Sequence, residues 1–387
     1  MDQIFTSTVT APVNIATLKY WGKRDPGLNL PTNSSISVTL AQSDLRTTTT
    51  ASCSANFTKD HLWLNGKEED VTAKRIQTLF KELRALRREI EEKSNGSSAP
   101  LSRFSLHIVS ENNFPTAAGL ASSAAGYAAL VKAIATLYQL PHSDEELSVL
   151  ARQGSGSACR SLFGGFVAWE MGEKQDGLDS KAVQIAPVEH WPQIKAAILV
   201  VSAEKKDTSS TSGMQVTVKT SPLFKERIEN VVPKRFETMK TAILERDFAT
   251  FAKLTMQDSN QFHAVCLDST PPIFYLNDVS RSAIRVVEEI NNKAGKPIAA
   301  YTFDAGPNAV IYYEEEHEQE VLGPIKNILK NSEGWNDSIG EVSATDFDKR
   351  WIETLRGGVD RVILTRVGPG PQKSSVSLVD KEGSPIV

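Results

Sequence analysis

The segment at residues 115–124 most constrains what this chain can fold into. It reads Pro-Thr-Ala-Ala-Gly-Leu-Ala-Ser-Ser-Ala, follows an apolar run at 104–109 and continues into small and apolar residues as far as Tyr138. This pattern predicts a strand, a tight glycine-containing loop and a helix over 121–138. Small side chains at a helix start let backbone N–H groups, aided by the helix dipole, approach a phosphate closely. The alternative is a small-residue helix that only packs tightly on a sheet.

Length and charge narrow the class of protein. The 387 residues suffice for one very large domain or two ordinary ones. The net charge of -4 argues against a nucleic-acid-binding surface, which normally carries a basic excess. The chain starts without a secretion signal, and no apolar run approaches the ~20 residues of a membrane span. These features predict a cytoplasmic protein with neither nucleic-acid nor membrane partners.

Cysteine and histidine usage gives no sign of a metal centre. The three cysteines, Cys53, Cys159 and Cys266, form no Cys-x-x-Cys pair, and the six histidines have no metal-ligand spacing. We therefore expect no metal-binding residues of the structural-zinc kind. Any anionic ligand would need a local group of Lys and Arg side chains, because the chain as a whole is acidic.

The order of predicted elements favours an α+β fold. Alternating and β-branched residues predict strands at 6–15, 34–51, 104–110, 162–169, 196–201, 298–303, 310–313 and 361–367. Periodicity and caps predict helices at 73–93, 121–138, 144–153, 222–246, 248–264 and 275–292. These elements interleave without regular βαβ alternation. A Pro- and Gly-rich change of character at 172–192 predicts two domains, 1–190 and 191–387.

Two further segments carry groups suited to an anionic ligand. Residues 14–23 read Asn-Ile-Ala-Thr-Leu-Lys-Tyr-Trp-Gly-Lys, with two lysines and a tyrosine near a glycine. Residues 154–161 read Gly-Ser-Gly-Ser-Ala-Cys-Arg-Ser and offer hydroxyls, backbone donors and a guanidinium for a carboxylate or phosphate. The alternatives are an exposed strand end for the first segment and a linker for the second.

An aspartate marks another candidate site. Asp304 follows the predicted strand at 298–303 and precedes the Gly-Pro pair at 306–307, which places its carboxylate for base chemistry. The alternative is that the Asp304 side chain has no catalytic role and only stabilises the turn. The polar segment at 205–212 could contact a ligand or form an ordinary loop.

Taken in order, these segments resemble the superfamily of galactokinase, homoserine kinase, mevalonate kinase and phosphomevalonate kinase. The closer resemblance is to the mevalonate diphosphate decarboxylase family of the eukaryotic type. Its specific marks are Lys-Tyr-Trp-Gly-Lys at 19–23 and Asp-Ala-Gly-Pro-Asn at 304–308. Ala121 stands where the usual kinase loop has its second glycine, and this is the form that the decarboxylase branch carries.

The resemblance implies a fold and a reaction. The fold would be an N-terminal ribosomal-protein-S5-like domain and a C-terminal ferredoxin-like domain around a central cleft, assembled as a homodimer. The enzyme would use ATP and Mg²⁺ to convert (R)-mevalonate 5-diphosphate to isopentenyl diphosphate, ADP, phosphate and CO₂ in isoprenoid and sterol biosynthesis. Two alternatives remain: a mevalonate or phosphomevalonate kinase of this fold, and a non-catalytic nucleotide-binding sensor.

The resemblance also implies roles for individual residues. Asp304 would deprotonate the 3-hydroxyl, Lys19 would keep that aspartate ionised, Arg160 and Asn14 would hold the C1 carboxylate, and Ser123 would lie nearest the γ-phosphate or metal. The residues expected to bind the substrate are Tyr20, Trp21, Gly22, Lys23, Arg75, Ser155, Gly156, Ser157, Ala158, Cys159, Arg160 and Thr211. The residues expected to bind ATP are Asn113, Pro115, Ala118, Gly119, Leu120, Ala121, Ser122 and Ser123.

Overall fold

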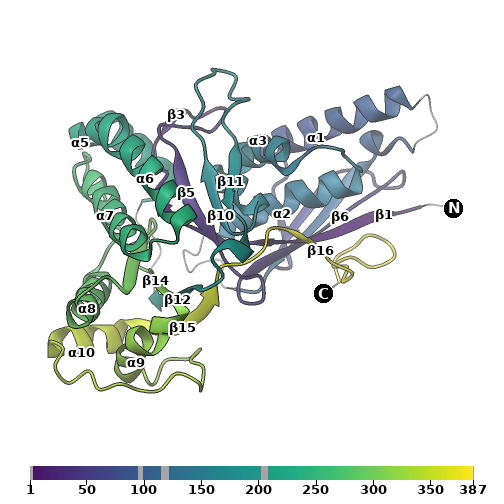
Figure 1. The fold of residues 1–387 in the computed structure, drawn as a ribbon. Helices are drawn as coiled ribbons and strands as arrows, with labels where there is room; N and C mark the ends of the chain where they lie inside the picture. Colours follow the sequence, from purple (N-terminus) through teal and green to yellow (C-terminus); the bar gives the residue numbers. More distant parts are fainter. Residues whose placement is uncertain (1–2, 95–98, 115–121, 202–207, 387) are drawn as a thin grey trace.

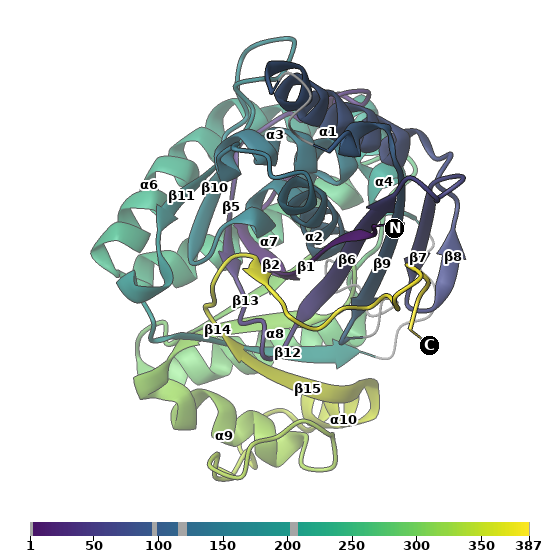
Figure 2. The same cartoon turned by 90° about the vertical axis from the view of Figure 1, so that its right-hand side faces the viewer.

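Helices and strands are mixed in the computed structural model, which describes residues 3–94, 99–114, 122–201 and 208–386 (Figures 1 and 2). The α+β fold predicted from the sequence is confirmed. None of the helices described combines the length and apolar character that a bilayer crossing requires.

A six-stranded sheet forms the N-terminal part of the molecule. Its order is β16-β1-β6-β9-β7-β8. The strands are β1 (Phe5–Pro12), β6 (Arg46–Ser54), β7 (His61–Leu64), β8 (Lys67–Glu69), β9 (Ser105–Asn112) and β16 (Gln372–Lys373). The helices that share its core are α1 (Lys74–Lys93), α2 (Ser122–Leu137) and α3 (Asp144–Gly154). The periodicity that predicted α1 is explained by its buried face, where Ile76, Leu79 and Leu83 pack into this core.

Two four-stranded sheets make up the middle and C-terminal parts. The middle sheet has the order β11-β10-β5-β2, with β2 (Asn14–Leu18), β5 (Ser35–Thr39), β10 (Phe166–Trp169) and β11 (Ala182–Ala186). The C-terminal sheet has the order β13-β14-β12-β15, with β12 (Ile194–Val201), β13 (Ala299–Phe303), β14 (Ala309–Glu314) and β15 (Val359–Arg366). A short pair, β3 (Lys23–Asp25) and β4 (Leu30–Pro31), follows β2.

Helices lie around the C-terminal sheet (Figure 1). Those of the central core are α6 (Val232–Glu245) and α7 (Phe248–Leu267), and those of the C-terminal core are α8 (Asp278–Ala294), α9 (Glu318–Ile328) and α10 (Lys349–Gly358). Before α6 come α4 (Ser210–Thr220), α5 (Pro222–Glu226) and a π-helical turn (Arg227–Val231). The 3₁₀ helices are Leu101–Arg103, Gly156–Leu162, Val188–His190 and Glu315–His317.

A shared central core joins the middle and C-terminal sheets. Ile15 and Val38 from the middle sheet belong to the same buried cluster as Phe251 of α7 and Tyr312 of β14. The hydroxyl of Tyr312 donates to the Ile15 carbonyl at 3.2 Å, across the boundary between the two sheets. The end of β2 is therefore fixed beside β13 and β14, and this contact determines where the site lies.

The end of the chain returns to the N-terminal sheet. Strand β16 pairs with β1, with Gln372 opposite Thr10, and the Leu378 N–H donates to the Thr50 hydroxyl at 2.9 Å. Figure 2 shows this yellow segment running beside the purple β1. The division into two domains, 1–190 and 191–387, stays a prediction. The last residues of the chain belong to the second of these ranges but pack on the sheet of the first.

Candidate active site

The paired side chains of Lys19 and Asp304 are at the centre of the site. Lys19 directly follows β2 and Asp304 directly follows β13, the two strands that adjoin in the central core. Lys19 Nζ donates to Asp304 Oδ1 at 2.7 Å. The lysine side chain is 3% exposed and the aspartate side chain 36% exposed. The carboxylate is therefore accessible to a ligand, whereas the ammonium lies enclosed behind it.

The turn after β13 holds Asp304 in place. The Gly306 N–H donates to the Asp304 carbonyl at 2.7 Å, and the Ser280 hydroxyl donates to the Pro307 carbonyl at 2.9 Å. The Asn308 Oδ1 accepts from the Val201 N–H at 2.8 Å. These bonds tie both sides of the Gly-Pro turn to α8 and β12, so the Asp304 side chain projects from a well-anchored backbone.

The ammonium of Lys19 lies in a mixed electrostatic environment. Burial lowers the pKa of Lys19 below its ordinary value of 10.5, Asp304 opposes this shift, and the Arg160 guanidinium adds to it. The charge on Lys19 therefore depends on the carboxylate beside it. Removing that carboxylate would leave a buried ammonium without its main partner.

Arg160 lies in a buried polar cluster close to this pair. Its Nε donates to Ser37 Oγ at 2.9 Å and to Asn14 Oδ1 at 3.3 Å, and its Nη1 donates to Ser35 Oγ at 2.6 Å. Asn14 Nδ2 in turn donates to Ser161 Oγ at 2.7 Å. Burial lowers the pKa of Arg160, and Asp304 opposes the shift. The guanidinium is thus held in one orientation near the exposed carboxylate.

The residues after Lys19 divide into two kinds. Trp21 is a core residue whose indole N–H donates to Thr217 Oγ1 at 3.1 Å and whose ring meets Phe262 edge-on. Tyr20 packs on Trp169, and its buried hydroxyl has no hydrogen-bond partner in the part of the chain that the structure describes. Because an unpartnered buried hydroxyl is costly, Tyr20 fits a ligand oxygen better than it fits a closed core.

Gly22 and Gly156 are required by their surroundings. Gly22 has φ +87°, and a Cβ there would lie 2.6 Å from the Phe224 ring. A Cβ at Gly156 would lie 2.9 Å from both Trp169 and Tyr20. Both glycines therefore allow the aromatic side chains near Lys19 to pack closely.

Two cations face the same region. Lys23 is buried, and its pKa is lowered to about 8, first by burial and then by the guanidinium of Arg75. Arg75 is exposed in the first turn of α1. Its positive charge also opposes the rise in the pKa of Tyr20 that burial causes. The positive charge of Arg75 therefore acts on Lys23, and both would favour an anionic group nearby.

The 3₁₀ helix at Gly156–Leu162 carries both buried and half-buried residues of the expected substrate site. Ala158 and Cys159 are buried, and the Cys159 thiol donates to the Gly156 carbonyl at 3.0 Å. Burial raises the pKa of Cys159 to about 12, so the thiol is protonated and packs as an apolar group. Ser157 is half-buried, and its carbonyl accepts from Asn14 Nδ2 at 3.0 Å.

The start of α2 adjoins the end of α3. Ser122 begins α2, and the exposed Ser123 Oγ lies 3.3 Å from Ser155 Oγ. Asn113 uses its side chain to hold the chain before β6, since its Oδ1 accepts from the Arg46 N–H at 2.8 Å. Five of the residues expected to bind ATP lie outside the described residues: Pro115, Ala118, Gly119, Leu120 and Ala121.

Thr211 was expected to bind the substrate, and the structure places it in the exposed first turn of α4. The same turn packs on the core through Gly213, where a Cβ would lie 3.2 Å from Trp21. Thr211 is therefore carried by a helix that contacts the segment after Lys19.

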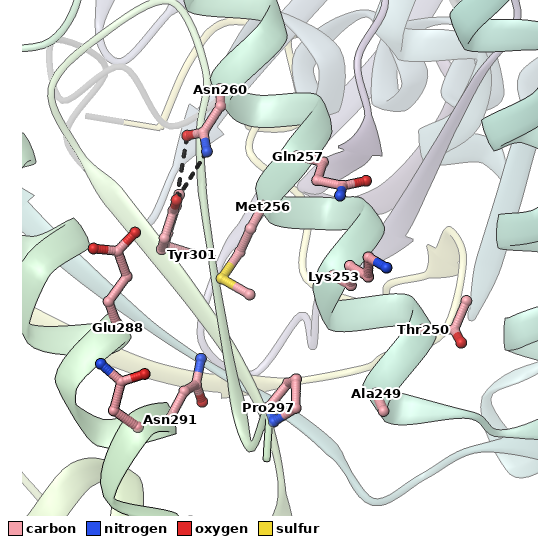
Figure 3. Close-up of a pocket in the computed structure, with 11 residues that line it drawn as sticks. Ala249, Thr250, Lys253, Met256, Gln257, Asn260, Glu288, Asn291, Pro297 and Tyr301 are labelled. Carbon is pink, nitrogen blue, oxygen red and sulfur yellow. Dashed lines mark hydrogen bonds between the residues drawn. The ribbon is translucent and has the colours of Figure 1, made fainter. Parts of the chain in front are cut away.

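A separate open cavity of about 560 Å³ lies between α7 and α8 (Figure 3). It is lined by Ala249, Thr250, Lys253, Met256, Gln257, Asn260, Glu288, Asn291, Asn292, Pro297 and Tyr301. Asn260 Nδ2 donates to the Tyr301 hydroxyl at 3.0 Å at one end. None of the site residues expected from the sequence lines this cavity.

Sequence reasoning missed several groups at the site. Ser35 and Ser37 face Arg160 because alternate residues of β5 point the same way, and this alternation was the available signal. Asp258 accepts the Lys19 backbone N–H at 2.7 Å. It lies on the buried face of α7 with Phe251 and Phe262, so a lone acid on an apolar helix face was its only sequence signal.

An exposed carboxylate paired with an enclosed ammonium, next to a fixed guanidinium and two further cations, defines an enzyme-like site for an anionic ligand. Two family models match the chain: the diphosphomevalonate decarboxylase-like N-terminal domain at 11–182 and the mevalonate 5-diphosphate decarboxylase C-terminal domain at 196–374. The chain belongs to the diphosphomevalonate decarboxylase family.

Individual relatives are similar to this chain over nearly its full length. The diphosphomevalonate decarboxylase of Debaryomyces hansenii is 62% identical over 383 residues, covering 99% of this chain and 98% of the relative. A crystal structure of mevalonate 5-diphosphate decarboxylase is 59% identical, with a TM-score of 0.92 and coverage of 98% of this chain and 99% of that chain. A solved complex of MDDEF with MVAPP, AMPPCP and magnesium is 29% identical, with a TM-score of 0.74 and coverage of 97% and 100%.

Proposed function

We propose that this chain catalyses the ATP-dependent decarboxylation of (R)-mevalonate 5-diphosphate to isopentenyl diphosphate, a step of the mevalonate pathway that supplies isoprenoids and sterols. The observation that carries the proposal is the Lys19–Asp304 pair beside the buried Arg160. Family membership over the whole chain supports the same reaction.

The chemistry explains why such a site is useful. The 3-hydroxyl of the substrate is a poor leaving group, because hydroxide is strongly basic. A new bond from this oxygen to the γ-phosphorus of ATP releases ADP and makes phosphate the leaving group. The C3–O bond then breaks, and positive charge develops at C3. The electron pair of the C1–C2 bond forms the C2=C3 double bond, which releases CO₂.

We assign the first step to Asp304 and Lys19. The half-exposed carboxylate of Asp304 orients the 3-hydroxyl and accepts its proton. Once this proton has passed on to the transferred phosphate, the regained negative charge of Asp304 favours the positive charge that develops at C3. The Lys19 ammonium, 2.7 Å from this carboxylate, holds Asp304 in place and would supply positive charge near the transferred phosphoryl group.

We assign recognition of the two ends of the substrate to two separate groups of residues. Arg160 and Asn14 hold the C1 carboxylate, because the guanidinium is fixed by serine hydroxyls and the amide. The residues assigned to the diphosphate and its surroundings are Tyr20, Lys23, Arg75, Ser155, Ser157 and Thr211. The unpartnered hydroxyl of Tyr20 and the paired charges of Lys23 and Arg75 support this assignment.

We assign the ATP phosphates to the start of α2, with Ser122 and Ser123 as hydroxyl donors. In the described part of the chain, no group of three or more His, Cys, Asp or Glu side chains could hold a metal. Mg²⁺ is commonly bound through substrate phosphates, waters and one or two protein oxygens. Ser123 Oγ would lie nearest the γ-phosphate or the metal, and Mg²⁺ would neutralise phosphate charge.

Product analysis tests the proposed function. Purified protein is given (R)-mevalonate 5-diphosphate with Mg²⁺ and ATP, and the products are identified by ¹H and ³¹P NMR. The proposal expects isopentenyl diphosphate, ADP and inorganic phosphate, with no conversion when ATP is omitted. Accumulation of a phosphorylated, carboxylate-containing product would identify a kinase instead. A folded protein that binds ATP but forms neither product would be the nucleotide-binding sensor.

Lys23 should make substrate capture depend on pH. Its pKa is lowered to about 8, so the ammonium is charged below this pH and loses its charge as the pH rises through it. We therefore expect kcat/KM to fall above about pH 8. Lys23→Arg keeps a charge over this range and should move the fall to higher pH. Identical pH profiles of kcat/KM for the two forms would assign the titration to another group.

We also propose that the enzyme is a homodimer that acts in the cytoplasm, as the family resemblance implies. Light scattering of the purified protein should then give twice the chain mass of 42.4 kDa.

A further inference from the structure

Asp258 holds the backbone of Lys19 from the side opposite the reaction. It lies on α7, is fully buried, and its Oδ2 accepts the Lys19 N–H at 2.7 Å. Arg227 donates from Nη1 to Asp258 Oδ1 at 2.8 Å and from Nη2 to Oδ2 at 2.9 Å. The same Nη2 donates to the Lys19 carbonyl at 3.1 Å. One carboxylate–guanidinium pair therefore binds both backbone polar groups of Lys19.

The pair is itself fixed by neighbours. Arg235 Nη1 donates to Asp258 Oδ1 at 3.0 Å, and Gln261 Oε1 accepts from Arg227 at 2.8 Å and from Arg235 at 2.9 Å. Arg227 begins the π-helical turn that precedes α6, a type of turn that often occurs at functional sites. Bidentate pairs of this kind restrict orientation as well as distance.

The pair is ionic despite its burial. Burial alone would raise the pKa of Asp258, but the Arg227 guanidinium, the Lys19 N–H and the Arg235 guanidinium together outweigh it and hold that pKa below its ordinary value. Asp258 also opposes the burial-driven lowering of the Lys19 pKa. The carboxylate thus acts on Lys19 in two ways, by holding its backbone and by placing a negative charge near its ammonium.

We propose that Asp258 and Arg227 are positioning residues, which hold the Lys19 backbone so that its ammonium meets the Asp304 carboxylate in the reactive arrangement. This inference rests on the proposed function. Catalytic groups need placement within about 0.5 Å, and a displacement of about 1 Å can cost ~10²-fold in rate. Neither residue contacts the exposed face of Asp304, so their effect is on turnover rather than on substrate binding.

Two variants distinguish the effect of holding the Lys19 backbone from the effect of the negative charge on Asp258. Asp258→Asn removes the negative charge and mismatches Arg227, whereas Arg227→Lys keeps both charges but loses the two-pronged bond. We expect kcat for CO₂ release to fall by ~10–10²-fold in each variant, with KM for mevalonate 5-diphosphate nearly unchanged. Glu91→Gln is the control, because it removes the negative charge from the partly buried Arg87–Glu91 pair on α1, at 2.9 Å, away from Lys19. It should lower the melting temperature but leave kcat unchanged.

The pH profile provides a readout that a purely structural role would not change. The titratable or charged groups that face Lys19 are Asp304 after β13, Asp258 and His263 on α7, Arg160 on its 3₁₀ helix, and Arg227. His263 is neutral, because burial lowers its pKa to about 3. Asp258→Asn should therefore move the alkaline fall of kcat to lower pH, since Lys19 loses a supporting negative charge. Arg227→Lys should lower kcat without this shift.

The outcomes are distinct. A wild-type protein that releases no CO₂ contradicts the proposed function. If the wild type is active and both Asp258→Asn and Arg227→Lys have the same kcat as the wild type, only the positioning role is contradicted. If Asp258→Asn does not fold, Asn33→Ala replaces it, because Asn33 Nδ2 donates to the Lys19 carbonyl at 3.0 Å without carrying a charge. That variant should lose about fivefold in kcat, the value of one hydrogen bond, and unchanged kcat there and in Arg227→Lys overturns the proposal.

Discussion

Asp304→Ala is expected to lower turnover by ~10²–10⁴-fold while leaving ATP binding nearly intact. The substitution removes the group that accepts the 3-hydroxyl proton and leaves the Lys19 ammonium without its partner at 2.7 Å. ATP binding is assigned to the start of α2, which this change does not touch. Steady-state CO₂ release gives the turnover, and titration calorimetry with a non-hydrolysable ATP analogue gives the affinity.

A matched control for Asp304 is Asp346→Ala. Asp346 pairs with Lys293 at 2.6 Å on the surface, so this change also removes a carboxylate from a lysine pair. Turnover of this variant should equal that of the wild type. Near-normal turnover of Asp304→Ala, with ATP bound as usual, would contradict the role assigned to Asp304.

Arg160→Lys should lower kcat/KM by ~10²–10³-fold. The guanidinium bonds Ser35, Ser37 and Asn14 at once, and a lysine cannot reproduce this planar arrangement or bind a carboxylate in two places. The C1 carboxylate would then be poorly held during both steps. Initial rates over a range of mevalonate 5-diphosphate concentrations measure the loss.

The control for Arg160 is Arg87→Lys in α1. Arg87 is also buried and donates hydrogen bonds to Glu91 at 2.9 Å, to the Tyr138 carbonyl at 2.9 Å and to the Ala99 carbonyl at 3.0 Å. Both variants therefore lose a buried guanidinium and some stability. Equal kcat/KM losses in the two variants would show that Arg160 acts only on folding.

Much of the fold could be predicted from local patterns. Helix α1 extends over Lys74–Lys93, as its apolar face predicts, and α7 and α8 follow from similar periodicity. The expected strand at 34–51 is wrong as one element, because the chain turns between β5 and β6. The expected strand at 162–169 begins only at Phe166, since Gly165 has φ +73°. Local patterns therefore predicted element type better than element limits.

Other elements were missed for physical reasons. The segment at 205–212 has no apolar periodicity, yet α4 begins at Ser210, where the Ser209 side chain accepts from the Ser212 N–H. Helix α9 contains Pro324, which usually ends a helix, but its apolar side chains are buried in the C-terminal core. Both helices are stabilised by tertiary packing, which a local sequence pattern does not show.

The site was only partly visible in the sequence. Lys19 and Asp304 are 285 residues apart, and no local pattern joins them. Their pairing was expected from family resemblance, and the structure brings them into contact because the Tyr312–Ile15 bond fixes β2 beside β14. Asp258 and Arg227 were missed because Asp258 is a lone acid on an apolar helix face, whereas Arg227 stands among other charged residues, and no local pattern joins two residues that are 31 positions apart.

The coupling of phosphoryl transfer to decarboxylation is tested most directly by the ratio of CO₂ to ADP in one experiment. Purified wild-type protein is mixed with (R)-mevalonate 5-diphosphate, Mg²⁺ and ATP, and both products are followed from the first turnover. We expect equal amounts of CO₂ and ADP once each turnover is complete. ADP without CO₂ would contradict it, because the Lys19–Asp304 pair would then serve a kinase and Arg160 and Asn14 would lose their assigned roles.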